Sequence, residues 1–258
     1  MKTAAWILKT LNRLVNMLVC VMLLLAGLYA GYALWDNNQV YVSAGNVQES
    51  MMRLKPAMTE GESDMAGPGF EELQAVNPDV CAWLCLDGTA VDYPVLQGRT
   101  NLSYLSTDVY GNYSLAGSIF LDSRNRRSGE DVYSVVYGHH MENHRMFGDL
   151  ELYRGARFFQ SAAGGRLILP DRVYRLIPLA CFQCPASEEL IFDPEYAAKH
   201  LDRVLDFAER NAEQLNEAEF AAVRAEENPR ILALTTCSTD YTDARTVLLT
   251  IIREIADS

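Results

Sequence analysis

Residues 80–96, with the sequence VCAWLCLDGTAVDYPVL, contain two short apolar runs, Val80–Leu86 and Ala90–Leu96, with turn residues between them. Runs of this length bounded by turn residues are typical of β-strands. Six more such runs follow along the chain: Gly117–Leu121, Asp131–Tyr137, Arg166–Leu169, Val173–Phe182, Ile231–Thr236 and Thr246–Ile252. Eight short strands predict a mainly β domain that is either a barrel or a sandwich.

The segment between the sixth and seventh runs has the spacing of a helix instead. Asp193 can cap a helix, and Pro194 directly after it suits the first helical position. We expect one helix from Pro194 to roughly Leu215, because apolar residues recur there at three- and four-residue steps. The helix should cover the β domain with its apolar stripe: Ala197, Leu201, Val204, Leu205 and Ala208.

Composition narrows the class of protein. The chain has 258 residues, and its 22 basic against 34 acidic side chains give a formal net charge of −12, which argues against nucleic-acid binding. Apolar residues make up 49% and charged residues 22%, so the chain can bury a substantial core and lacks the polar bias of disordered proteins. With 16 glycines, 6 cysteines and one long apolar run, it is not collagen-like, a disulfide framework or a multi-span membrane protein.

The one long apolar run, Leu14–Trp35, is long enough to cross a lipid bilayer, since its 22 residues span roughly 33 Å as a helix. The residues before it carry basic charge and no acidic charge, which predicts a cytoplasmic N-terminus: Lys2, Lys9 and Arg13. The alternative is a signal peptide cleaved near residues 31–33, although the apolar core of a signal peptide is usually shorter.

These features divide the chain into four parts. We expect residues 1–13 in the cytoplasm and residues 14–35 in the cell membrane as a single-pass anchor. Residues 36–76 are predicted to be a polar stalk with short helical segments. Residues 77–258 are predicted to be the β domain, outside the cell.

Of the six cysteines, Cys20 lies inside the apolar run and five follow it. Four of these five fall in predicted strands, where three interpretations stay open, namely packed thiols, a disulfide or a metal site: Cys81, Cys85, Cys181 and Cys184. A zinc site fits poorly, because only the second pair has the interval that zinc ligands usually show. Cys237 is left over and needs a separate explanation.

Three groups at predicted strand ends could carry chemistry. They are Tyr137-Gly138-His139-His140, Thr235-Thr236-Cys237 and Asp243-Ala244-Arg245. Taken singly, each has an ordinary structural interpretation: an exposed histidine, a packed cysteine and an arginine in a surface salt bridge.

The three groups are more informative together. A hairpin-like connection between the last two strands would bring Cys237 and Arg245 to the same end of the sheet. A guanidinium group beside a thiol lowers the thiol pKa, and its N–H groups can stabilise the oxyanion that forms when the thiolate attacks a carbonyl. His139, on a third strand end, could complete a pair of nucleophile and acid.

At these residues the sequence resembles the sortases, which are membrane-anchored cysteine transpeptidases of Gram-positive bacteria, and it is most similar to class B. The similarity covers about residues 70–253, and its motifs follow in the family's order: Asn77–Val80 with Trp83, Gly88–Gln97, Gly117–Asp122, Tyr137–His139, Met146–Leu150, Thr235–Cys237 and Arg245. The resemblance implies an eight-stranded sortase-type β-barrel with a long covering helix between strands 6 and 7.

The resemblance also implies roles for individual residues. His139 corresponds to the catalytic histidine of the family, Cys237 to its nucleophile and Arg245 to its essential arginine. No cofactor or metal is implied. Three more residues occupy positions that line the substrate groove in class B enzymes: Asn101, Tyr137 and Thr235. At the position of Thr235 the family commonly has serine.

The implied reaction is transpeptidation. Cys237 attacks the peptide bond after the threonine of a C-terminal sorting motif, of the Asn-Pro-x-Thr type in class B, on a secreted surface protein. An amine of a peptidoglycan precursor or of a pilin subunit then resolves the thioester. No lid segment precedes the β domain, which favours attachment to the cell wall. Two alternatives use the same features: an exported cysteine protease in which water resolves the acyl-enzyme, and a surface binding module in which Cys237 is buried.

Overall fold

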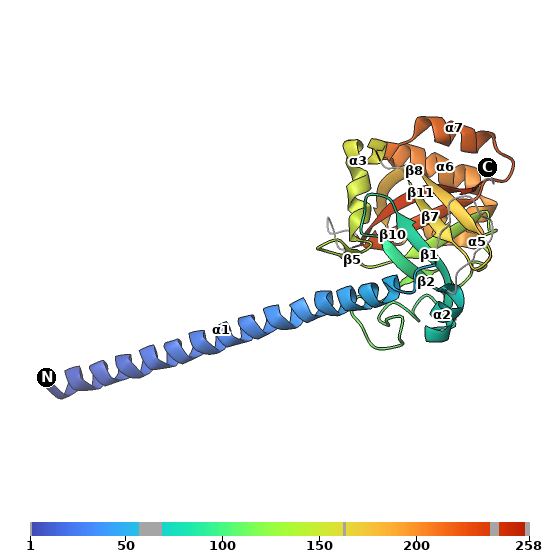
Figure 1. Ribbon diagram of the computed structural model, residues 1–258. Coiled ribbons are helices and arrows are strands. Elements are labelled where there is room, and N and C mark those ends of the chain that lie inside the picture. Colours follow the sequence, from blue (N-terminus) through green and yellow to red (C-terminus); the bar gives the residue numbers. More distant parts are fainter. Residues whose placement is uncertain (1, 57–68, 162–163, 238–242, 256–258) are drawn as a thin grey trace. The chain divides into compact units, whose positions relative to one another are not determined.

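The computed structural model describes residues 2–56, 69–161, 164–237 and 243–255, and for residues 2–5 and Cys237 it describes the backbone alone. The chain forms two compact units, residues 1–43 and 44–258. Helix α1 (Lys2–Met52) accounts for the first unit, and its last turns, from Ala44 onward, belong to the second (Figure 1). By length and composition α1 is able to cross a membrane.

The segment after the apolar run differs from our expectation. We predicted a polar stalk with short helical segments, whereas α1 continues without a break to Met52. The physical reason is that no proline interrupts the chain between Trp35 and Met52, so the backbone hydrogen bonds of the apolar helix simply propagate. Residues 57–68 of the predicted stalk lie outside the described residues. Helix α2 (Gly69–Val76) follows them and ends before Pro78, because a proline disfavours helical geometry in the residue before it.

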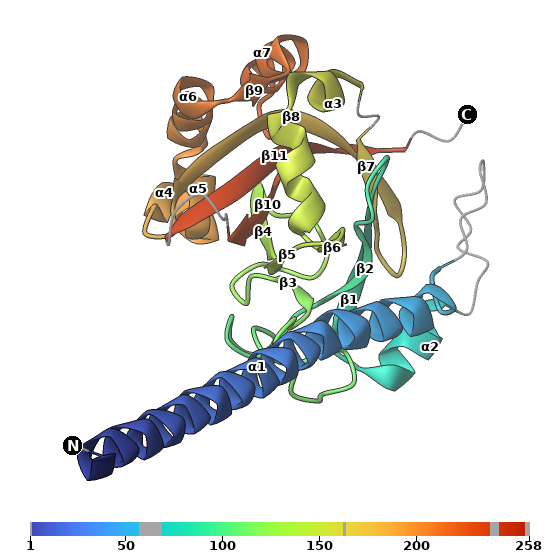
Figure 2. The same ribbon diagram turned by 90° about the vertical axis from the view of Figure 1, so that its left-hand side faces the viewer.

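The second unit contains a closed β-barrel (Figures 1 and 2). The strands follow one another around it in the order β11, β10, β4, β3, β2, β1, β7 and β8, and β8 pairs with β11 to close it. Pairing is parallel between β2 and β3 and between β4 and β10, and antiparallel elsewhere in the barrel. The strands are β1 (Val80–Leu86), β2 (Asp92–Leu96), β3 (Ile119–Leu121), β4 (Tyr133–Tyr137), β7 (Gly165–Ile168), β8 (Val173–Pro185), β10 (Ile231–Cys237) and β11 (Ala244–Glu254).

The predicted eight-stranded barrel is therefore confirmed, with one strand for each of the eight apolar runs. All seven residues of β1 are buried, because one face of the strand lines the barrel and the other is covered from outside. Short elements add to this frame: the hairpin of β5 (His140–Met141) and β6 (Arg145–Met146), the 3₁₀ helix η1 (Gly148–Arg154), helix α3 (Ala156–Ser161), and β9 (Gln214–Leu215) on the edge of β8.

The covering segment between β8 and β10 is not one long helix. Four short helices replace it: α4 (Glu189–Phe192), α5 (Pro194–Lys199), α6 (Leu201–Asn211) and α7 (Glu217–Ala225). Asp193 caps α5 as predicted, since its side chain accepts hydrogen bonds from two backbone N–H groups. The predicted helix divides at His200, where α5 packs on β4 and α6 packs on β8, so the two pieces follow different strands of a curved sheet.

Two apolar clusters hold the layers together. In the first, the covering helices pack on one face of the sheet formed by β4, β10, β11 and β8, with members such as Val204, Phe220, Ala233 and Val247. In the second, the end of α1 and helix α2 pack on β1, β2 and β3: Met51, Phe70, Leu73, Trp83 and Leu96 are among its members. The two clusters fix the strands whose ends carry the candidate site.

Candidate active site

One edge of the barrel gathers the strand ends that the sequence singled out. Strands β4 and β10 run parallel, so their carboxyl ends, Tyr137 and Cys237, lie at the same edge. Strand β11 runs antiparallel to both β10 and β8, and it begins at this edge one residue before Arg245. The predicted groups thus come from three neighbouring strands, in the order β4, β10 and β11, and β8 follows β11 on its other side.

The register of these strands decides which residues are neighbours. Cys237 of β10 is the partner of Arg245 of β11, and Arg245 is in turn the partner of Cys184 of β8. Two positions along, Thr235 of β10 is the partner of Tyr137 of β4. The hairpin-like juxtaposition of Cys237 and Arg245 that the sequence predicted is present in the backbone register.

His139 follows β4 by two residues and is held by a backbone carbonyl. Its Nε2 lies 2.7 Å from the carbonyl oxygen of Leu105. A carbonyl oxygen can only accept a hydrogen bond, so Nε2 must carry the proton in this contact. The acceptor is itself tightly placed, because Gly117, at φ +58°, passes so close that a Cβ there would lie 2.5 Å from the same oxygen.

Gly138 gives His139 its position in a different way. A Cβ at Gly138 would lie 2.5 Å from Ile119 and 2.8 Å from Phe147, so only glycine lets the chain turn out of β4 between these side chains. The hairpin that follows is fastened on its far side, where the backbone N–H of Phe147 donates to the carbonyl of His139 and Arg145 donates to Gln48 of α1. The residues on both sides of His139 in the sequence are therefore held in place, and they fix the position of the histidine.

The cysteines other than Cys237 are free thiols. In the β domain all four are buried, and burial raises the pKa of each, to about 12 for Cys81 and for Cys184. Of the three interpretations that the sequence left open, these four cysteines fit the packed thiols, and the interpretation as a disulfide is wrong. Among the described residues, no group of three or more His, Cys, Asp or Glu side chains could hold a metal ion.

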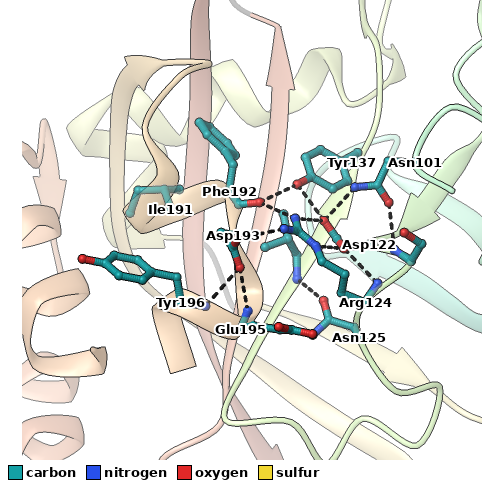
Figure 3. A network of polar contacts seen from close by, with 12 residues as sticks. Asn101, Asp122, Arg124, Asn125, Tyr137, Ile191, Phe192, Asp193, Glu195 and Tyr196 are labelled. Carbon is teal, nitrogen blue, oxygen red and sulfur yellow. Dashed lines mark hydrogen bonds and ion pairs between the residues drawn. The ribbon is translucent and has the colours of Figure 1, made fainter. Parts of the chain in front are cut away.

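Two of the three residues predicted to line the substrate groove share one partner, the carboxylate of Asp122 (Figure 3). Asn101 donates to its Oδ2 at 2.8 Å, and the hydroxyl of Tyr137 lies 3.1 Å from the same oxygen. The third residue, Thr235, is 1% exposed, and its hydroxyl has no hydrogen-bond partner in the part of the chain that the structure describes. A buried hydroxyl without a partner is unusual enough to need an explanation.

Sequence reasoning missed Asp122 and Arg124 as functional candidates. In the sequence, Asp122 was considered only as the last residue of the motif Gly117–Asp122, and Arg124 was not considered. The usable signal is a carboxylate directly after a short apolar strand with an arginine two positions on, although this pattern also describes an ordinary surface pair. The role of the Leu105 carbonyl carries no sequence signal, because every residue has the same backbone group.

Comparison with known proteins agrees with this architecture. No protein-family model matches the chain. Sortase B of Staphylococcus aureus is 30% identical over 177 residues, which cover 68% of this chain and 70% of that protein. The crystal structure of a class B sortase of Streptococcus pyogenes involved in pilus biogenesis has 35% identity and a TM-score of 0.65, covering 71% of this chain and 97% of that one. The structure of a Staphylococcus aureus sortase B-substrate complex has 26% identity and a TM-score of 0.70, covering 85% and 99%.

The relative of 30% identity extends over more than two thirds of both chains, and the structural neighbours share the closed barrel over nearly their whole length. Both findings agree with the order of motifs in the sequence. The chain belongs to the sortase family, with class B sortases as its relatives, and is a cysteine transpeptidase.

Proposed function

We propose that Cys237, His139 and Arg245 are the catalytic residues of this transpeptidase. The observation that carries the proposal is the register of β10 and β11, in which Cys237 and Arg245 are partners at the barrel edge from which His139 emerges. A guanidinium beside a thiol favours the thiolate and offers N–H donors to an oxyanion, so one arginine serves both the nucleophile and the first transition state.

The reaction has two halves. The thiolate sulfur of Cys237 attacks the carbonyl carbon of the threonine in the sorting motif, and Arg245 stabilises the oxyanion of the tetrahedral intermediate. The C–N bond then breaks, and the departing amine takes a proton from His139, leaving a thioester. In the second half an acceptor amine attacks the thioester, gives a proton to His139 and releases the thiolate of Cys237.

The contact between His139 and the Leu105 carbonyl determines which ring nitrogen of His139 transfers protons. Because Nε2 holds its proton against a group that only accepts, Nδ1 is the nitrogen that exchanges protons with the leaving and attacking amines.

Three residues contact the sorting peptide: Asn101, Tyr137 and Thr235. Thr235 supports this most directly, since its buried hydroxyl lacks a partner in the described chain and a backbone group of the peptide would supply one. The substrate is the C-terminal sorting signal of a secreted surface protein, of the Asn-Pro-x-Thr type. The acceptor is an amine of peptidoglycan.

The apolar stretch of α1 anchors the enzyme in the cell membrane. Its length and composition support a single span over residues 14–35, and the basic residues before it support a cytoplasmic N-terminus. Residues 77–258 then work outside the cell, joined to the anchor by residues 36–76. This location supplies both the secreted protein and the wall precursor.

The experiment that tests the proposed function incubates the full chain in detergent with Asn-Pro-x-Thr peptides, with and without an amine such as a short oligoglycine. Transpeptidation predicts that mass spectrometry detects the peptide joined to the added amine, and that Cys237→Ala removes the product. Release of the free acid at the same rate whether or not amine is present would instead support the hydrolase alternative. A pilin lysine peptide in place of oligoglycine tests the acceptor class.

A further inference from the structure

The carboxylate of Asp122 is buried and lies at the centre of a polar network that reaches the surface at Arg124 (Figure 3). Asp122 directly follows β3 and is 0% exposed. Arg124 binds both of its oxygens, with Nε 2.9 Å from Oδ1 and Nη2 2.8 Å from Oδ2. Asn101 and Tyr137 bind Oδ2, and the backbone N–H of Arg124 donates to Oδ1 at 3.0 Å. The carboxylate thus connects three side chains from three separate segments.

The network keeps Asp122 ionised. Burial by itself would raise the pKa of this carboxyl, but the hydrogen bonds from Arg124 and Asn101 and the charge of Arg124 outweigh burial and lower the pKa below its ordinary value. A charged acceptor binds its donors more strongly than a neutral one does. Asp122 is therefore ionised at neutral pH, where it can hold Asn101 and Tyr137 in fixed orientations.

Arg124 extends the network to the covering helices. Its Nη2 donates to the carbonyl of Phe192, at the end of α4, at 2.8 Å, and its Nη1 lies 3.0 Å from a carboxylate oxygen of Asp193, the cap of α5. The hydroxyl of Tyr137 also lies 3.3 Å from the Phe192 carbonyl. The junction of α4 and α5 is thus tied to the strand end that leads to His139.

We propose that Asp122 and Arg124 are positioning residues for the peptide groove. They orient Asn101 and Tyr137 and hold the α4–α5 junction beside them, and neither touches the reacting atoms. The inference rests on the proposed function, because it assumes that Asn101 and Tyr137 contact the sorting peptide. It assigns the network an effect on peptide binding, which is separable from the chemistry at Cys237.

The first test is Asp122→Asn, which keeps the side-chain shape and removes the charge. We expect KM for a sorting peptide to rise at least about 10-fold, as loss of hydrogen bonds to a charged group implies, while kcat stays close to the wild-type value. Alkylation of Cys237 by a small reagent should keep its rate. An unchanged KM, or a fall in kcat at constant KM, would overturn the inference.

The matched control is Asp131→Asn. Asp131 also pairs with an arginine, Arg126, and also accepts from an asparagine, Asn125, but neither partner is among the residues predicted to line the groove. We expect this variant to keep the wild-type KM. A rise in KM equal to that of Asp122→Asn would mean that any weakened ion pair in this region has the effect, and would overturn the positioning role.

A second variant keeps the inference testable if Asp122→Asn does not fold. Arg124→Lys keeps the positive charge but cannot bind the carboxylate, the Phe192 carbonyl and Asp193 together, because an ammonium group lacks the planar fork. If Arg124 acts through Tyr137, combining Arg124→Lys with Tyr137→Phe should raise KM less than the product of the two single effects. If the two single effects on KM multiply instead, Arg124 and Tyr137 act independently, and the positioning role is wrong.

Turnover by the wild type separates this inference from the proposed function. A wild type that turns over sorting peptide beside an Asp122→Asn variant with unchanged KM contradicts the positioning role alone. A wild type that turns over no sorting peptide contradicts the proposed function, and the positioning role with it.

Discussion

Two cysteines flank the same arginine, and they lie on strands with different neighbours. Cys184 on β8 and Cys237 on β10 are both register partners of Arg245. Cys184 lies under the covering helices in the apolar cluster with Ile191 and Val247, and burial raises its pKa to about 12, with the charge of Arg245 only partly opposing this. Cys237 ends its strand, next to β4 and therefore on the side from which His139 comes.

The comparison teaches that a nearby guanidinium does not by itself make a thiol reactive. For Cys184 the desolvation of the thiolate, together with the negative charge of Glu188, outweighs the attraction of Arg245, so the pKa is raised and this thiol stays protonated at neutral pH. A nucleophile needs the arginine, access for the substrate and an acid beside it. In the sheet order β8, β11, β10, β4, only the β10 side of Arg245 adjoins the strand that leads to a histidine.

The largest expected difference between the two cysteines concerns turnover. Cys237→Ala should abolish both cleavage and transfer, because it removes the sulfur that forms the thioester. Cys184→Ala should keep near wild-type turnover and lose roughly 1 kcal/mol or more of unfolding free energy, since it removes a packed sulfur. Product analysis by mass spectrometry and thermal unfolding measure the two effects. A reversal, with Cys184 essential and Cys237 dispensable, would break the comparison.

Variants of the two adjacent histidines after β4 test the Cys237 side of this comparison. His139→Gln should lose nearly all activity although glutamine can still donate to the Leu105 carbonyl, because an amide cannot exchange the proton. His140→Gln is the matched control and should lose much less. Steady-state rates with one sorting peptide measure both. Equal losses would mean that the choice between the adjacent histidines is wrong.

Arg245→Lys separates the two roles of the shared arginine. Lysine keeps the charge that favours the thiolate, so alkylation of Cys237 should proceed at nearly the wild-type rate. It lacks the planar fork that can donate to the oxyanion, and peptide turnover should fall at least ~100-fold. Turnover near wild type would remove the oxyanion role, whereas slow alkylation would show that Arg245 acts mainly on the thiolate.

The smallest expected effect is on stability at alkaline pH. The folded-state pKa of about 12 for Cys81 and for Cys184 is above the unfolded value of about 8.5, so their contribution to stability is complete below pH 8.5 and is lost as the pH rises toward 12. The free energy of unfolding should fall over this range, and Cys184→Ala should make the fall shallower. Denaturant titrations at several pH values measure this fall. If the free energy of unfolding falls with pH by the same amount in wild type and variant, Cys184 is accessible to solvent in the folded state.

Much of the fold followed from local patterns. The apolar runs predicted all eight barrel strands because each strand is a short run bounded by turn residues, and β1 spans the residues expected for it. The patterns did not predict the division at His200, since the side chains on both sides of it also fit one continuous helix. That division depends on which strands the two pieces contact, which is a property of the folded sheet.

The site was predictable to a smaller extent. The pairing of Cys237 with Arg245 followed from two strands joined in sequence, a local feature. The network around Asp122 did not, because it joins segments around residues 101, 122, 137 and 192 that come together only in the barrel. A charged residue after a strand is usually exposed, and only the structure gives the complete burial of Asp122.

The most direct test of the account is to find which thiol carries the acyl group. The full chain in detergent is mixed with an Asn-Pro-x-Thr peptide without added amine, quenched in acid, digested and mapped by mass spectrometry. We predict one acyl adduct, sensitive to hydroxylamine as a thioester is, on the fragment that contains Cys237. An adduct on the fragment that contains Cys184, or product formation that continues in Cys237→Ala, would contradict the assignment of Cys237 as the nucleophile.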